Sequence, residues 1–142
     1  MSAQMGWKHE FSVETTADAE TIWAFFQDVP GWKSWNAGIE SSELEGPFAD
    51  GTWFTMKPPH QDAFRSQLID VRPMERFVDE TRVGDLVVRV AHRIERIEPR
   101  GTRVTYAVEA IGPDAPQIGS AIASDFPDVL AALASLAEKQ NS

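Results

Sequence analysis

The chain has 142 residues, of which 42% are hydrophobic and 10% aromatic, so it is long and apolar enough to bury the core of one domain. Its formal net charge of -9 opposes binding to nucleic-acid phosphates and to anionic membrane surfaces. The absence of cysteine excludes disulfides, thiolate metal ligands and thiol catalysis. We therefore expect a single domain over residues 1–142, with no nucleic-acid partner and no stable membrane association.

The cellular location is predicted from the start of the chain and from its lack of cysteine. Residues 1–10 lack the basic start and apolar stretch of a signal peptide, and no run of eighteen apolar residues is present. A cysteine-free chain suits a reducing compartment. These features predict a cytoplasmic protein.

The first elements are a strand and two short helices. Alternation over residues 7–14 predicts the strand, and a helix with a heavily apolar face is expected from about Ala17 to the break at Asp28. A second short helical piece is expected over residues 32–36. We expect both helices to act as lids or plugs on a sheet.

The middle of the chain predicts an antiparallel meander, because short runs rich in Val, Ile, Thr and Phe are divided by Gly, Pro and Asp at turn positions. We expect six strands there, over residues 39–45, 51–57, 64–71, 76–83, 85–97 and 102–111.

A long amphipathic helix is expected from about Ala115 to Glu138, packed on a core along one side only. Its predicted core stripe is Ile118, Ile122, Phe126, Val129, Leu130, Leu133 and Leu136. Pro127 removes a backbone hydrogen bond inside this helix, so a bend or a break is expected there.

Four segments carry a resemblance to a known family. They are WAFFQDVPGWKSWNAGI, ELEGPFADGTWF, HRIERIEPRGTRVTYAVEAIGP and FPDVLAALASLAE. Together they resemble the polyketide cyclase/dehydrase and lipid-transfer branch of the START-like, or SRPBCC, superfamily. The resemblance implies an α+β helix-grip fold: a seven-stranded curved antiparallel sheet around a long C-terminal helix, with two short helices after the first strand. It also implies a hydrophobic pocket between sheet and helix.

The alternation and pairing of strand residues predict a polar cluster on the inner face of the sheet. If Gly84 and Asp85 form a two-residue turn, then Phe77 pairs with His92 and Asp79 pairs with Val90 on the inner face. The following strand places Tyr106 opposite His92 or one pair away. A one-residue slip at the turn would bring Glu80 inward instead of Asp79.

Three interpretations of the cluster of Asp79, His92 and Tyr106 stay open. The side chains can satisfy one another or a bound water and serve core specificity alone. They can orient a ligand carbonyl or hydroxyl in an apolar cavity. They can also act as general acid and base, which makes all three the candidates for a catalytic role.

The residues expected to contact a ligand lie on the inner face of the strands and on one side of the terminal helix. They are Phe54, Met56, Phe64, Leu68, Phe77, Val90, His92, Tyr106, Ile118, Ile122 and Phe126. Trp53 is expected on the outer face, where it covers a sheet edge or meets a second subunit of a homodimer.

No metal or cofactor site is predicted. His9, His60 and His92 lack the spacing of metal-binding motifs, and the glycines form no phosphate-binding loop. We therefore expect binding of a small apolar or aromatic ligand, polyketide-like or lipid-like, in an internal cavity. The alternatives are a polyketide cyclase or dehydratase that uses His92 with Tyr106 or Asp79, and a stress or chaperone-associated interaction module with an exposed apolar groove.

Overall fold

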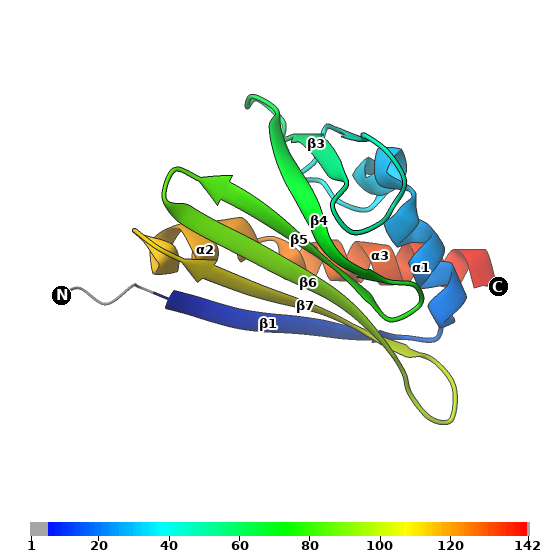
Figure 1. Cartoon of the computed structure of the whole chain (residues 1–142). Coiled ribbons are helices and arrows are strands. Elements are labelled where there is room, and N and C mark those ends of the chain that lie inside the picture. Colours follow the sequence, from blue (N-terminus) through cyan, green and yellow to red (C-terminus); the bar gives the residue numbers. More distant parts are fainter. Residues whose placement is uncertain (1–5, 142) are drawn as a thin grey trace.

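The fold is built on one antiparallel sheet in the order β1-β7-β6-β5-β4-β3-β2, seen in a computed structural model that describes residues 6–141 (Figure 1). The strands are β1 (Gly6–Thr15), β2 (Ser41–Leu44), β3 (Trp53–Lys57), β4 (Phe64–Arg72), β5 (Arg76–Val83), β6 (Leu86–Arg96) and β7 (Thr102–Ile111). The helices are α1 (Ala19–Gln27), the 3-10 helix η1 (Val29–Ser34), α2 (Ala115–Ala123) and α3 (Phe126–Asn141). The signal-peptide prediction concerns in part residues 1–5, which lie outside the described residues.

The predicted fold class and element order are confirmed: a seven-stranded curved sheet, two short helices after β1, and a C-terminal helical segment. The strand ends agree with the expected ranges because glycines take turn conformations that other residues avoid. Gly84 has a φ of 60° between β5 and β6, and Gly101 has a φ of 126° between β6 and β7. Asp18 caps α1, since its carboxylate accepts a hydrogen bond from the Thr21 amide at 2.8 Å.

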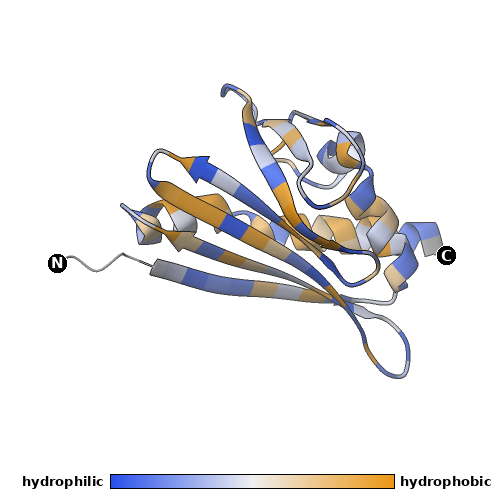
Figure 2. Ribbon diagram, in the orientation of Figure 1, coloured by the Kyte–Doolittle hydropathy of each residue, from blue (hydrophilic) through white to orange (hydrophobic). Residues whose placement is uncertain are grey.

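The C-terminal helical segment covers the inner face of the sheet, behind the strands in the view of Figure 1. Figure 2 shows hydrophobic residues along α3 and along the first part of β6. On α3 the side chains of Val129, Leu130 and Leu133 are buried against the core. The Thr15 hydroxyl donates a hydrogen bond of 2.6 Å to Glu138, which fastens the end of α3 to the end of β1.

The expected break in the terminal helix is confirmed, and it separates α2 from α3 at Ser124 and Asp125. Pro127 then lies in the first turn of α3, where its missing N–H costs no helical hydrogen bond. Gly119 allows α2 to approach β1, because a side chain at this position would overlap the ring of Trp7. The break turns Phe126 toward the sheet, where its ring meets Tyr106 edge-on at 5.3 Å.

The α2–α3 segment is long and strongly apolar. Ala115–Gln140 is the one helical stretch among the described residues that is long and apolar enough to cross a membrane. Length and composition are weak evidence, because a core helix passes the same test. Here the buried side of the segment packs on the sheet.

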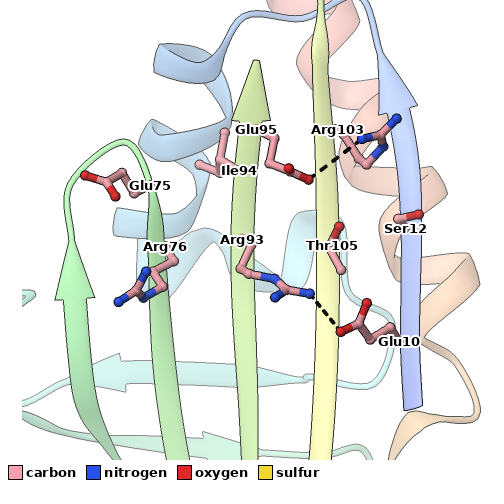
Figure 3. Close-up of a pocket in the computed structure, with 9 residues that line it drawn as sticks. All are labelled: Glu10, Ser12, Glu75, Arg76, Arg93, Ile94, Glu95, Arg103 and Thr105. Atoms are coloured by element: carbon pink, nitrogen blue, oxygen red, sulfur yellow. Dashed lines mark hydrogen bonds and ion pairs between the residues drawn. The ribbon is translucent and has the colours of Figure 1, made fainter. Parts of the chain in front are cut away.

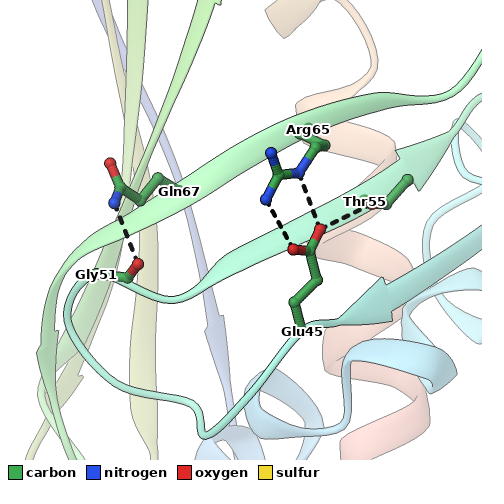
Figure 4. Close-up of polar contacts among 5 residues, drawn as sticks. All are labelled: Glu45, Gly51, Thr55, Arg65 and Gln67. Atoms are coloured by element: carbon green, nitrogen blue, oxygen red, sulfur yellow. Dashed lines mark hydrogen bonds and ion pairs between the residues drawn. The ribbon is translucent and has the colours of Figure 1, made fainter.

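The outer face of the sheet carries paired charges. Figure 4 shows Arg65 bound to both carboxylate oxygens of Glu45, at 2.9 and 2.7 Å, with Gln67 bound to the carbonyl of Gly51. The same Arg65 guanidinium lies 4.6 Å above the ring of Trp53, which is 38% exposed on this face as predicted. A second subunit at Trp53 stays a prediction.

Candidate functional site

A cavity of about 550 Å³ lies between the inner face of the sheet, the loop after η1, and the α2–α3 break. Its lining is mainly apolar and aromatic, as in small-molecule sites. The lining residues are Trp32, Trp35, Asn36, Ile39, Met56, Phe64, Phe77, Asp79, Thr81, Arg82, Val83, Val88, Val90, His92, Tyr106, Ile118, Ile122 and Phe126.

Nine of the eleven residues predicted to contact a ligand line this cavity: Met56, Phe64, Phe77, Val90, His92, Tyr106, Ile118, Ile122 and Phe126. Phe54 and Leu68 do not, so the prediction that these two residues line the cavity is wrong. Both are fully buried, and the Trp32 ring packs edge-on against Phe54 at 5.4 Å. Alternation identified the correct face for both residues, but Trp32 of η1 covers Phe54. Contact with a ligand stays a prediction for the nine.

Eight lining residues were not predicted as ligand contacts or cluster residues: Trp32, Trp35, Asn36, Ile39, Thr81, Arg82, Val83 and Val88. Trp35, Asn36 and Ile39 reach the cavity from the loop after η1. Trp35 and Asn36 were expected only in a lid or plug, and Ile39 was expected at the start of the next strand. Thr81 and Val88 share the inner face with Asp79 and therefore follow from the same alternation. The two-residue turn gives the inward face of both residues, but it does not give which inward side chains border a cavity.

The hairpin register is as predicted. Phe77 pairs with His92, Asp79 with Val90, and His92 with Tyr106 across the next ladder. Asp79 therefore faces the cavity, which settles the choice between it and Glu80. Glu80 lies on the outer face, where it accepts a hydrogen bond of 2.9 Å from Arg89.

His92 is held between aromatic rings in the cavity wall. Its ring stacks on Phe77 at 3.9 Å with an interplanar angle of 6°, and the Tyr106 ring meets it edge-on at 4.5 Å. Nδ1 lies 3.2 Å from the carbonyl oxygen of Phe77. Because a carbonyl only accepts, Nδ1 carries the proton, and Nε2 of the neutral ring is an acceptor.

Burial controls the ionisation of the cluster. It lowers the pKa of His92 to about 3, against smaller opposing effects of backbone carbonyls at Phe77 and Val90. It raises the pKa of Asp79 to about 7. The Tyr106 pKa is raised, first by burial and then by the nearby carboxyls of Asp79 and Asp125. The ring of His92 is therefore neutral beside a carboxyl that ionises near neutral pH.

The polar atoms at the cavity are poorly satisfied by the protein itself. Within residues 6–141 the Asp79 carboxyl, 7% exposed, makes no hydrogen bond, and its one contact in ion-pair range joins Oδ2 to Nε2 of His92 at 3.9 Å. The Tyr106 hydroxyl likewise has no hydrogen-bond partner in this part of the chain. The indole N–H of Trp35 is buried without an acceptor among the described residues. The three cluster residues therefore make no direct hydrogen bond to one another, and the interpretation that they satisfy one another or a bound water stays a prediction.

Phe126 provides a stability test of the cavity. Its ring is 9% exposed and borders the empty space, whereas Phe54 is fully buried in the solid core. We expect Phe126→Ala to lower the free energy of unfolding by about 2 kcal/mol and Phe54→Ala to lower it by about 3 to 5 kcal/mol. Urea unfolding of both variants checks this difference. Equal losses at the upper value would show that Phe126 is packed like Phe54.

A second hollow, of about 590 Å³, lies on the outer face of β1, β5, β6 and β7 (Figure 3). Although it is slightly larger, its walls are charged side chains in mutual ion pairs. Arg93 binds Glu10 at 2.9 Å, and Arg103 binds Glu14 at 2.8 Å and approaches Glu95 at 3.9 Å. We assign it to the solvated surface, since exposed ion pairs of this kind contribute little.

A curved sheet that grips a C-terminal helical segment over an apolar cavity defines the helix-grip class of domain. The chain belongs to the polyketide cyclase/dehydrase and lipid transport family, whose family model matches residues 7–138. This family fold supports hydrophobic ligand binding or cyclase activity.

Solved structures share the fold at low sequence identity. An aromatase/cyclase named Zhui from a Streptomyces species has a TM-score of 0.82 at 14% identity, with 97% of each chain covered. A norcoclaurine synthase mutant from Thalictrum flavum, with a transition-state analogue, has a TM-score of 0.78 at 13% identity over 100% of each chain. A START superfamily protein from Mycobacterium smegmatis has a TM-score of 0.76 at 16% identity, covering 94% of this chain and 98% of its own.

These likenesses show the fold alone. Comparison with curated protein sequences gives no match.

Proposed function

We propose that the protein binds a small apolar or aromatic ligand, polyketide-like or lipid-like, in the cavity between sheet and terminal helices. The observation that carries this proposal is a cavity of about 550 Å³ in which Asp79, His92 and Tyr106 face a mainly apolar wall. Burial of apolar surface contributes about 25 cal/mol per Å², so a ligand that buries about 250 Å² gains about 6 kcal/mol before ordering costs. The polar groups then orient the ligand.

Filling the cavity tests this proposal. We expect the wild type to enhance the fluorescence of a hydrophobic dye, and we expect the double variant Val90→Phe, Ile118→Trp to lower dye affinity at least tenfold, because both side chains line the cavity. Ala107→Trp is the control, since Ala107 follows Tyr106 on β7 and lies on the opposite face. Equal dye affinity in all three proteins would show that the cavity is not the binding site.

Cyclase or dehydratase activity is the second candidate, and the ionisation of Asp79 is the observation that favours it. A carboxyl with a pKa of about 7 beside the unprotonated Nε2 of His92 is suited to accept and return a proton on an enolisable substrate. Zhui, a structural neighbour, is an aromatase/cyclase. Turnover of a poly-β-keto thioester by the wild type, lost in Asp79→Asn and in His92→Phe, would support catalysis, and binding without turnover would exclude it for that substrate.

A further inference from the structure

The uncompensated charge in the cavity wall is negative. Asp79 lies in its wall, buried and without a hydrogen bond to residues 6–141. Arg82 is the one cation among the described lining residues, but its guanidinium pairs with the outer-face carboxylate of Glu80 at 3.2 Å and its side chain is 69% exposed. The imidazole of His92 does not neutralise Asp79, because burial keeps it uncharged. Residues 6–141 therefore supply no counter-ion for the Asp79 carboxylate.

A second carboxyl lies next to the cavity wall, at a residue that does not itself line the cavity. Asp125 is half-buried at the break between α2 and α3, directly before the lining residue Phe126. A methyl group added to Gly38 would lie 2.9 Å from Oδ2 of Asp125, so this carboxyl abuts the loop that carries Asn36 and Ile39. Asp79 and Asp125 both raise the pKa of the Tyr106 phenol. Their fields therefore overlap at the centre of the site.

The acceptor atom of His92 and the aromatic rings of the wall have the same preference. Nε2 of His92 is an acceptor, since Nδ1 donates to the carbonyl of Phe77. Trp32, Phe77 and Phe126 line the cavity with rings whose faces carry partial negative charge. A ligand group placed beside Asp79 and His92 meets two acceptors, and it must itself be a hydrogen-bond donor, best a positively charged one.

We propose that the ligand carries a protonated amine on an aromatic or apolar body, and that Asp79 binds the ammonium group while the apolar walls bury the rest. Nε2 of His92 accepts a second N–H of the same group. The inference rests on the proposed binding function and adds to it the chemical class of the ligand. A neutral ketone, which has no donor, leaves the Asp79 carboxylate buried and unpaired.

Matched ligands test the proposal. Tryptamine and tryptophol share the indole body and differ in an ammonium against a hydroxyl group. We expect calorimetric titration at about pH 8, where Asp79 is ionised, to give at least tenfold tighter binding of tryptamine by the wild type. Asp79→Asn, which keeps the shape of the side chain, should reduce this preference to within twofold and leave tryptophol binding unchanged.

Two further variants control for charge. Glu109→Gln removes one negative charge from the outer face of β7, where Glu109 is paired with Lys8 at 3.8 Å, and it should keep the full preference for tryptamine. Asp125→Asn should lower the preference by a smaller factor than Asp79→Asn. Thermal unfolding by circular dichroism confirms that each variant is folded.

The outcomes separate this inference from the proposed function. Equal binding of both ligands by the wild type, or an unchanged preference in Asp79→Asn, overturns the amine assignment and leaves the binding function standing. Loss of the preference in Asp125→Asn alone overturns the role of Asp79. If neither ligand binds and the hydrophobic dye does not bind either, the proposed binding function itself is wrong.

Discussion

Ending the chain after Gly112 should abolish cooperative folding, because it removes α2 and α3 and exposes the inner face of the sheet. Leu130, Leu133 and Ala137 on α3 are between 0 and 1% exposed, and Val129 is 3% exposed. Burial of a large aliphatic side chain contributes about 1.5 to 3 kcal/mol, so the loss of these contacts is comparable to the whole stability of a domain, about 5 to 15 kcal/mol.

Thermal and urea unfolding followed by circular dichroism check this expectation. The control is a chain that ends after Glu138, which keeps the hydrogen bond from Thr15 and removes only residues 139–142. It should unfold cooperatively, close to the full chain. A monomer ending after Gly112 that still melts cooperatively would contradict the role given to the terminal helices.

The sheet was predictable because its determinants are local. Gly84 and Asp85 form a two-residue turn, and this turn fixes the pairing of every residue along β5 and β6. The inward position of Asp79 and the contact of His92 with Tyr106 follow from that register. The break near Pro127 was predictable for the same reason, since a missing N–H acts within one helical turn.

The cavity boundary was not predictable from local patterns. The alternation of side chains along a strand shows which face of the sheet a side chain lies on. It does not show which residues pack against that side chain. Trp32 covers Phe54 only because the chain folds back after α1. Next to Leu68, the pairing of β4 with β5 is irregular, because the register shifts between Leu68 and Asp70. Trp35 and Asn36 enter the wall for the same long-range reason. Whether the Asp79 carboxyl and the Tyr106 hydroxyl find hydrogen-bond partners also depends on the tertiary fold, and local patterns do not predict it.

The two buried titratable groups predict a pH dependence that single substitutions should reveal. Burial raises the pKa of Asp79 from 3.8 to about 7, so between these values the folded protein holds a proton that the unfolded chain has lost. By itself this makes stability fall as pH rises. Burial lowers the pKa of His92 from 6.5 to about 3, so between those values the unfolded chain binds a proton that the folded protein excludes. By itself this makes stability rise with pH.

The two effects cancel in the wild type between about pH 4 and about pH 6.5, because folded and unfolded chains then each hold one proton on the pair. His92→Phe keeps a ring stacked on Phe77, and Asp79 is then the only titratable group of the pair. Relative to the wild type, its free energy of unfolding should fall by about 1.4 kcal/mol per pH unit across that window. In Asp79→Asn, His92 is the only titratable group of the pair. Relative to the wild type, the free energy of unfolding of this variant should rise with pH by the same amount per pH unit.

Urea unfolding of the wild type, both single variants and the double variant at several pH values measures these slopes. Subtracting the wild-type curve removes the contribution of the other titratable groups, since these are unchanged. The double variant should run parallel to the wild type, because the two opposite slopes are removed together. Parallel curves for all four proteins would mean that Asp79 and His92 titrate alike in folded and unfolded chains. The cluster would then be open to water, and the buried, unpaired carboxyl assigned to the cavity wall would be wrong.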